Sequence, residues 1–212
     1  MVAKLAALWA LRFPKVKRKG RKLGKGSFGK VYAIDARTVV KVVDLHCRGS
    51  GRGALATSWR AHLRKEAEMA RVMGYMGVGP HVTAVTERLN RYMLVFMERA
   101  DGTLANWIQK SHTPQQLAGA RRAVEGLFRK MHDAGWYHGD VKAENIAYMI
   151  RGDGRVRFRL IDFGWTHRAS DGPKTGFPYA KNWWLAGKRD KYLKETLDGI
   201  FRGEPPSYEY YS

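Results

Sequence analysis

The chain has 212 residues, 44% of them hydrophobic, and its 39 Lys and Arg against 19 Asp and Glu give a formal net charge of +20. This length and apolar content suffice to bury a sizeable core, and the single cysteine, Cys47, excludes an internal disulfide framework and suits a reducing compartment. No apolar run reaches membrane-spanning length, and the 7 histidines show no paired spacing typical of a zinc site.

Residues 1–22 are predicted to form a basic N-terminal extension. An apolar run from Leu5 to Leu11 precedes the densest basic run, Lys15 to Lys22. The basic run disfavours an export signal, so we expect a short helix at the apolar run. The positive field favours nucleic acid, anionic surfaces or acidic proteins as partners, and the basic run also resembles a nuclear localisation signal. A solvated basic face without a partner is the alternative for any single cluster.

Three glycines, Gly24, Gly26 and Gly29, are followed by Val31 in the pattern GxGxxGxV. Glycines at this spacing let a β-hairpin bring backbone N–H groups close to phosphates. A dinucleotide-binding loop with the same glycines needs a hydrophobic strand before it and a helix after it. Here a basic run comes before the glycines and the strand-like Val31 to Ile34 comes after them, which favours the hairpin.

A single lysine interrupts the apolar run Thr38 to Val43, which follows a predicted turn at Asp35 to Arg37. Lys41 needs an anionic partner there, because an isolated buried ammonium is strongly disfavoured.

The segment Ser58 to Met73 is predicted to be an amphipathic helix. Its inward stripe consists of Leu63, Ala67, Ala70 and Met73. Glu66 borders this stripe and Glu68 falls on another face, so Glu66 is the predicted partner of Lys41. The alternative is that both glutamates are solvated partners of neighbouring basic residues.

The later elements are predicted from their periodicity and turn residues. The run Tyr92 to Leu104 indicates a buried strand, a short polar linker and the start of a helix. Within Ala123 to Tyr137 a second amphipathic helix is predicted to end at Gly135. Its apolar stripe is Val124, Leu127, Phe128 and Met131. Two strand-like runs, Ile146 to Ile150 and Val156 to Ile161, flank an Asp-Gly turn and predict a hairpin.

Two polar motifs lie on either side of that hairpin. The sequence His138-Gly139-Asp140-Val141-Lys142-Ala143-Glu144-Asn145 precedes it, and Ile161-Asp162-Phe163-Gly164 follows it. Either motif alone could be a turn rich in His, Gly and Asp. Their order, behind the glycine pattern and the strand lysine, indicates a phosphotransferase. The ordered set resembles the motifs of the eukaryotic-type protein-kinase superfamily, and the resemblance covers Leu23 to about Gly164.

The resemblance implies ATP and Mg²⁺ as cofactors and gives each motif residue a role. Asp140 would orient the acceptor hydroxyl, and Lys142 would neutralise the transferring phosphoryl group, as in Ser/Thr-directed members. Asn145 and Asp162 would bind magnesium. Lys41, held by Glu66, would bind the ATP phosphates.

The nucleotide would also contact residues outside those motifs. The backbone of Gly24, Gly26 and Gly29, with Val31, would cover the phosphates. In the strand and linker near Glu98 to Gly102, Met97 would lie beside the adenine as gatekeeper. The backbone of Glu98 and Ala100 would supply the hydrogen bonds to the adenine.

The sequence departs from ordinary kinases after the second motif. The segment Gly176 to Ala180 faintly resembles the end of an activation segment, but no Pro-Glu follows it. Lys188 to Phe201 is predicted to supply one closing helix, with Leu193, Leu197 and Phe201 as its stripe. Gly139 replaces the Arg that many kinases use to bind an activation-loop phosphate, as in vaccinia-related and small atypical kinases. A phosphate-triggered switch is therefore not expected.

The fold class is predicted to be α+β, a two-lobed kinase-like fold with an antiparallel N-lobe and a reduced, mainly helical C-lobe. Residues 23–100 would form the N-lobe and residues 101–212 the C-lobe. The short, basic chain resembles compact kinases of large DNA viruses, which implies an intracellular location, in the host cytoplasm or nucleus or with the virion.

The predicted function is a serine/threonine protein kinase that acts on a protein hydroxyl and does not depend on activation-loop phosphorylation. A nucleic-acid-binding pseudokinase and a small-molecule kinase are the alternatives. The expected partners are an acidic protein substrate, nucleic acid at the basic surface, no membrane, and a protein that completes the reduced C-lobe.

Overall fold

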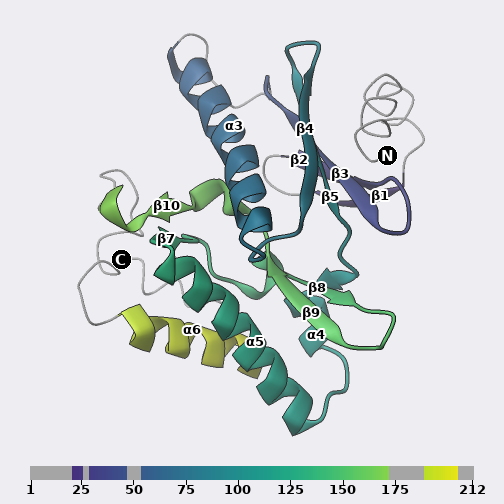
Figure 1. Cartoon of the computed structure of the whole chain (residues 1–212), viewed down its shortest axis with the longest axis vertical. Coiled ribbons are helices and arrows are strands. Elements are labelled where there is room, and N and C mark those ends of the chain that lie inside the picture. The colour runs from purple at the N-terminus through teal and green to yellow at the C-terminus, as the bar shows by residue number, and fades with distance from the viewer. Residues whose placement is uncertain (1–20, 26–28, 47–53, 172–188, 205–212) are drawn as a thin grey trace. The chain divides into compact units, whose positions relative to one another are not determined.

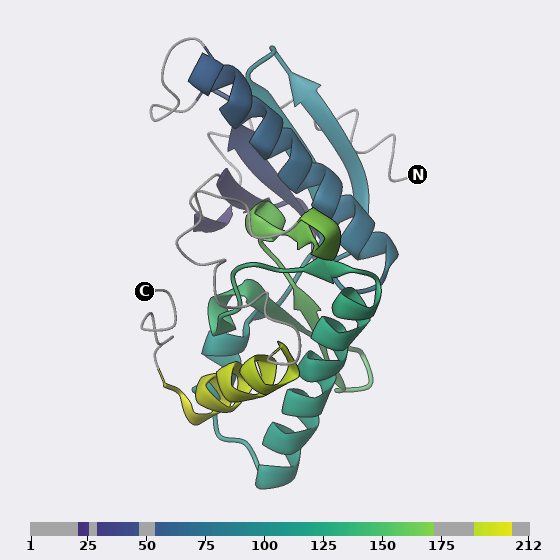
Figure 2. The same ribbon diagram turned by 90° about the vertical axis from the view of Figure 1, so that its left-hand side faces the viewer.

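The computed structural model describes residues 21–25, 29–46, 54–171 and 189–204. The chain divides into two compact units, Met1–Ala100 and Asp101–Ser212. Each unit combines helices and strands, so the α+β prediction is confirmed (Figures 1 and 2). The predicted helix at Leu5 to Leu11, the start of the basic run and the segment Gly176 to Ala180 lie outside the described residues.

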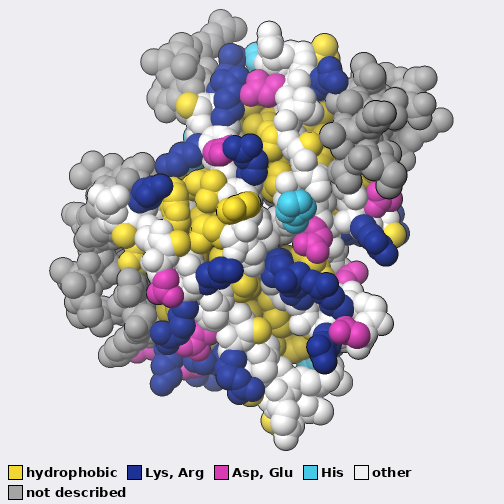
Figure 3. Space-filling view, viewed as in Figure 1, with side chains coloured by type: hydrophobic (Ala, Val, Ile, Leu, Met, Phe, Trp, Pro, Cys, Tyr) yellow, Lys and Arg dark blue, Asp and Glu magenta, His cyan; other side chains and the backbone are white. Residues whose placement is uncertain are grey.

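Basic side chains are plentiful on the surface of the described residues. Figure 3 shows more Lys and Arg than Asp and Glu on the face that it presents. None of the helices in the described ranges combines the length and apolarity that a bilayer crossing requires.

The first unit contains an antiparallel sheet of five strands in the order β1-β2-β3-β5-β4. The strands are β1 (Lys22–Lys25), β2 (Gly29–Ala33), β3 (Thr38–Asp44), β4 (Val82–Arg88) and β5 (Tyr92–Glu98). The turn between β2 and β3 is confirmed, because Asp35 Oδ1 accepts the backbone N–H groups of Arg37 and Thr38 at 2.7 and 2.8 Å. The edge strand β4 has no counterpart in the sequence predictions.

Helix α3 (Ala54–Tyr75) packs on one face of this sheet (Figure 2). Leu63 and Ala67 of the helix join a buried cluster with Val43, Met93 and Val95 of the strands. A second cluster fills the other face and consists of Tyr32, Val40, Val42, Leu94 and Phe96. Strand β3 is buried on both faces, which explains why its sequence is a nearly unbroken valine run instead of an alternation of apolar and polar residues.

The second unit is built around helix α5 (Pro114–Asp133). Thr113 begins it with a capping box, since Thr113 Oγ1 accepts from Gln116 N at 3.2 Å and Gln116 Oε1 accepts from Thr113 N at 2.8 Å. The segment Ala123 to Tyr137, in which this helix was predicted, covers only the second half of α5. The predicted stop at Gly135 is confirmed, since α5 ends at Asp133 and Gly135 has a φ of 76°. Trp136–Tyr137 then form β7, which pairs with β10 (His167–Arg168).

Short elements surround α5. Helix α4 (Leu104–Ile108) follows β6 (Gly102–Thr103), which pairs with β8 (Ile146–Ile150), and β8 pairs with β9 (Val156–Leu160). The predicted β8–β9 hairpin is thus confirmed, with Gly154 at a φ of 77° in its turn. Three single-turn 3₁₀ helices are η1 (Ala143–Asn145), η2 (Phe163–Trp165) and η3 (Ala169–Asp171).

The predicted closing helix is α6 (Arg189–Arg202), which packs against α5. Its buried residues are Leu193, Leu197 and Ile200, so Phe201 was the wrong third member of the stripe. An i+3 step after Leu197 stays closer to the inward direction than a second i+4 step, because a helix turns every 3.6 residues.

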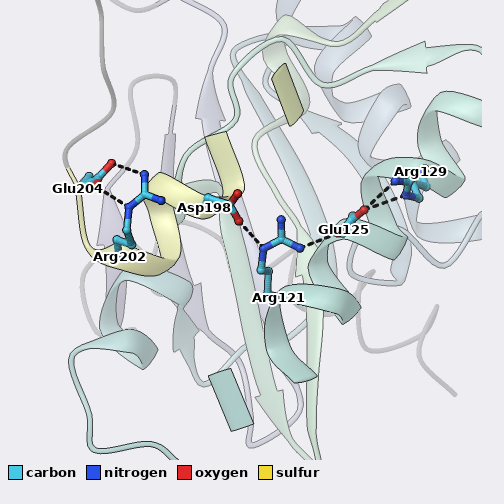
Figure 4. A network of polar contacts seen from close by, with 6 residues as sticks. All are labelled: Arg121, Glu125, Arg129, Asp198, Arg202 and Glu204. Atoms are coloured by element: carbon cyan, nitrogen blue, oxygen red, sulfur yellow. Dashed lines mark hydrogen bonds and ion pairs between the residues drawn. The ribbon is translucent and has the colours of Figure 1, made fainter. Parts of the chain in front are cut away.

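An ionic network joins α5 to α6 (Figure 4). Arg121 of α5 donates from Nε to Asp198 Oδ1 of α6 at 2.7 Å and from Nη1 to Glu125 Oε2 at 2.9 Å. The second oxygen of Glu125 accepts from Arg129 at 2.8 Å. The Arg121 side chain is only 24% exposed, whereas Arg202, which pairs with Glu204, is 61% exposed.

Replacing Arg121 with Ala should lower the free energy of unfolding by roughly 1 kcal/mol, since two charge-assisted hydrogen bonds with little exposure are lost. Urea unfolding monitored by circular dichroism would measure the change, and amide exchange in α6 should rise. Arg202→Ala is the control and should change neither readout. Equal effects of the two substitutions would show that the Arg121 bridge does not hold α6.

Candidate active site

The candidate residues fall into two groups, one in each unit. The first group contains the described members of the glycine pattern, the strand lysine with its glutamate, and the residues that end β5. The second group contains the two motifs that flank the β8–β9 hairpin.

Lys41 and Glu66 are brought together in the first unit. Lys41 lies in the middle of β3 and donates from Nζ to Glu66 Oε1 of α3, with side-chain exposures of 19% and 7%. Glu66 Oε2 is buried and has no hydrogen-bond partner among the described residues. Glu68 is exposed and pairs with Arg71 at 2.9 Å. The helix therefore separates the two glutamates as its periodicity predicted.

The glycine pattern is described only at its ends. Gly29 in β2 lies so close to β3 that a Cβ atom there would be 2.8 Å from the carbonyl oxygen of Val42. Gly24 pairs with Val31, and Val31 in turn lies directly opposite Lys41 across β2 and β3. Gly26 lies outside the described residues. The absence of a side chain at Gly29 thus lets this end of the glycine pattern lie close to β3, the strand that carries Lys41.

The end of β5 is fixed by backbone hydrogen bonds. Met97 is half-buried beside the cluster that α3 covers. The N–H of Glu98 donates to the carbonyl of His81 at 2.9 Å, and that of Arg99 donates to the carbonyl of Arg37 at 2.8 Å. Ala100 is the last residue of the first unit.

Asp140 is the centre of the second group. Its Oδ2 accepts from Lys142 Nζ at 2.7 Å and from Asn145 Nδ2 at 2.7 Å, and Asn145 Nδ2 also donates to the Asp140 carbonyl at 2.9 Å. No hydrogen bond of the described residues uses Asp140 Oδ1. One carboxylate oxygen is thus fixed by two donors, and the other can accept a hydrogen bond from a further group.

Asp162 follows β9 in a left-handed backbone conformation, with φ 65° and ψ 67°. Its Oδ1 is buried and has no hydrogen-bond partner among the described residues. Because Asn145 uses its amide nitrogen toward Asp140, its amide oxygen is left for another role. Carboxylate and amide oxygens suit Mg²⁺, which usually takes one or two protein ligands and fills its shell with phosphates and water. The residues present therefore fit a magnesium ion. Among the described residues, no group of three or more His, Cys, Asp or Glu could hold a metal by itself.

His138 positions this group from within the core. It is 2% exposed and lies between the rings of Phe128 and Phe163, at centroid distances of 6.1 and 5.4 Å. Its Nε2 donates to the carbonyl of Ile161 at 2.9 Å, and its Nδ1 accepts from Asp140 N at 3.4 Å. Burial lowers the pKa of His138, and its hydrogen bond and the nearby carboxylates oppose this only in part. The neutral tautomer with the proton on Nε2 satisfies both contacts.

Gly139 adopts a conformation that only glycine tolerates there. Its φ is 79°, and a Cβ atom would lie 2.5 Å from the carbonyl oxygen of Trp165. The sequence did not predict the contact between Gly139 and Trp165, because no motif assigned a role to Trp165.

Stability should fall as the pH drops below about 6.5, because the unfolded chain protonates His138 there while the buried neutral ring does not. One such histidine contributes at most about 1.4 kcal/mol per pH unit. Urea unfolding at pH 5 to 8 should therefore show a shallower pH slope in His138→Gln than in the unmodified chain. The exposed His81→Gln is the control, and an unchanged slope in the His138 variant would contradict the assignment.

Several known protein sequences are similar to this chain. The family described as protein kinase domain matches residues 17–191. Calcium-dependent protein kinase 1 of Arabidopsis thaliana is 28% identical over 151 residues, which are 68% of this chain and 24% of that protein. The hormonally up-regulated neu tumor-associated kinase of Mus musculus is 31% identical over 157 residues, which are 68% of this chain and 20% of that protein.

A third relative, CBL-interacting protein kinase 22 of Oryza sativa, is 30% identical over 165 residues, which are 68% of this chain and 35% of that protein. The matched region thus spans about a third or less of each of these relatives. The family match covers most of this chain and includes both motif groups. The chain belongs to the protein kinase family.

Proposed function

We propose that the chain is a serine/threonine protein kinase that transfers the γ-phosphoryl group of Mg-ATP to a protein hydroxyl. The observation that carries the proposal is the bonding of Asp140. Two donors fix its Oδ2, and Oδ1 is left to accept a hydrogen bond from the hydroxyl of the acceptor. A purely structural turn would not need a carboxylate with one oxygen fixed by two donors and the other oxygen left to accept from another molecule.

Lys142 supports transfer to an alcohol. Its ammonium bonds Asp140 Oδ2 at 2.7 Å and carries a positive charge within reach of any group that Asp140 contacts. Charge on a transferring phosphoryl group spreads over its oxygens, so a fixed cation beside the acceptor lowers the barrier.

Asn145 and Asp162 would hold magnesium, which would neutralise the phosphates of ATP. The buried, unpartnered Asp162 Oδ1 supports this role, because an isolated buried carboxylate oxygen costs free energy unless a cation or donor satisfies it. The bond between Asn145 Nδ2 and Asp140 orients the amide so that its oxygen is the available end.

In the first unit, Lys41 would bind the ATP phosphates. Glu66 holds its ammonium in a mostly buried position, which limits the rotamers that the long side chain can adopt. Val31 lies next to Lys41 on the sheet, and the backbone of Gly24 and Gly29 would lie over the phosphates. Met97, Glu98 and Ala100 would contact the adenine.

We also propose that activity does not require phosphorylation of the segment after Gly164. The start of that segment is held without a phosphate, since β10 pairs with β7 and Ala169 N donates to the Gly135 carbonyl at 2.8 Å. Arg168 lies over the Trp136 ring at 4.5 Å. Gly139, in turn, offers no cation to a phosphate.

The partners and the location are part of the same proposal. The net charge of +20 supports an acidic protein substrate, and the use of ATP supports an intracellular site of action. A further protein that completes the C-lobe, the resemblance to viral kinases and a host-cell location stay predictions.

Asp140→Asn and Asp162→Asn should each lower the rate of phosphate transfer by on the order of 10²-fold or more, because positioning and charge dominate this chemistry. Radiolabelled ATP with casein as an acidic acceptor and histone as a basic acceptor would measure it. Asp133→Asn, at an exposed position in the last turn of α5, is the matched control and should keep the full rate.

The alternatives give different results in the same assay. An unchanged rate in Asp162→Asn would sink the assignment. Binding of Mg-ATP without any transfer by the unmodified chain would indicate a pseudokinase. Transfer to small alcohols but to neither protein would indicate a small-molecule kinase.

Treatment with a phosphatase should leave the transfer rate unchanged, because backbone pairing between β7 and β10 already holds the start of the segment. Mass spectrometry would verify that the treated chain carries no phosphate before the rate is measured. A large loss of rate that returns on rephosphorylation would show that the segment is regulated in the ordinary way.

A further inference from the structure

The second strand of the β8–β9 hairpin and the residue before it alternate strictly between arginine and apolar residues. The sequence is Arg155-Val156-Arg157-Phe158-Arg159-Leu160. Side chains on a strand point to opposite faces in turn, so the arginines share one face and the apolar residues share the other. Phe158 and Leu160 are buried, whereas Arg155 and Arg157 are exposed. Arg159, at the inner end, is 7% exposed.

The residue that follows the first strand adds a third exposed arginine to this face. Arg157 lies opposite Met149, and Arg151 N donates to the Arg155 carbonyl at 2.8 Å, which places Arg151 opposite Arg155 at the turn. We name Arg151, Arg155 and Arg157 the arginine face. Figure 3 shows Lys and Arg side chains gathered over this hairpin.

Two carboxylates border the arginine face. Asp101 Oδ2 accepts from Ile150 N at 2.7 Å. Asp153 in the turn lies 3.6 Å from Arg155, whose side chain is 87% exposed. Arg151 and Arg157 form no ion pair with any of the described residues. Like charges that face each other across two strands destabilise a sheet, so this arrangement costs stability in the isolated protein. An anionic ligand would offset that cost.

Spacing and chemistry identify the ligand. Alternate residues on a strand are about 6.8 Å apart, so Arg155 and Arg157 present two guanidinium groups at that spacing, and Arg151 adds a third across the turn. A guanidinium binds phosphate oxygens through two parallel hydrogen bonds. A two-stranded ribbon also fits the major groove of duplex DNA. We propose that the arginine face binds the phosphodiester backbone of a nucleic acid.

An acidic protein fits this face less well. Protein interfaces have an apolar centre, but Met149, the apolar residue between the arginines, is buried at 7% exposure. The exposed aliphatic pair of the hairpin, Ile150 and Val156, lies on the opposite face of the ribbon. Phosphate contacts need only cations, which is what the face supplies.

The test must separate a site from general attraction, because the whole chain is strongly positive. The full chain would be titrated, without ATP, into a fluorescein-labelled DNA duplex of 20 base pairs, and anisotropy would be followed at several salt concentrations. The triple variant Arg151→Gln, Arg155→Gln, Arg157→Gln removes the face. The control Arg122→Gln, Lys130→Gln, Lys194→Gln removes the same charge from exposed positions on α5 and α6.

Each phosphate contact contributes roughly 0.9 to the slope of log affinity against log salt on duplex DNA, so loss of the face should reduce the slope by about 2 to 3. Affinity in low salt should fall at least tenfold, and the control should lose much less. Equal losses in the two variants, or no loss in the first, would overturn the proposal. It would also fail if polyglutamate bound the unmodified chain more tightly than the duplex and lost that affinity in the arginine variant.

The result does not depend on the proposed kinase activity. Both variants leave the motif residues intact, and no nucleotide is present in the titration. Circular dichroism spectra of the two variants should superimpose, since all six side chains are exposed, and the arginine variant should melt no lower than the control, because it removes like charges that face each other in the hairpin. A chain that binds the duplex through this face without transferring phosphate would support the inference and refute the kinase proposal.

Discussion

Both backbone groups of Ile161 are bonded to the loop that carries Asp140, and the geometry of the second motif group depends on these two bonds. Its N–H donates to the Asn145 carbonyl at 2.8 Å, and its carbonyl accepts from His138 Nε2 at 2.9 Å. Asp162 is the next residue, so its position relative to Asn145 is fixed by main chain rather than by flexible side chains. This precision is what a shared metal ion would require.

The buried His138 can hold this arrangement only in its neutral form. A charged imidazole at 2% exposure would be strongly disfavoured, and the neutral ring keeps one donor and one acceptor. The donor holds Ile161 and the acceptor faces Asp140 N, so one uncharged ring orients both motifs. Packing between Phe128 and Phe163 limits its rotation.

Local patterns predicted the parts of the fold that obey a simple period. Helical spacing separated Glu66 from Glu68, and an Asp-Gly turn between two apolar runs located the β8–β9 hairpin. Strand β4 has the alternating burial of an edge strand, but its small and polar residues carry little apolar signal. The start of α5 was missed because its apolar stripe begins late, although Thr113 and Pro114 are capping signals that could have found it.

The contacts of the candidate site were less predictable than its residues. The motifs named Asp140, Asn145 and Asp162, but the bonds through Ile161 join residues far apart in sequence and use only backbone atoms. No side-chain pattern reports such bonds.

Gly139 shows how a single position can exclude one kind of regulation. A side chain there would face a left-handed φ of 79° and a carbonyl oxygen 2.5 Å from its Cβ atom. Arginine at this position would therefore have to displace Trp165 before it could bind anything. That displacement would pull on β10, which begins two residues after Trp165 and pairs with β7. The pairing of β7 with β10 thus depends on the close approach of Gly139 and Trp165. A phosphate-binding arginine could not be introduced at position 139 without rebuilding the start of the segment.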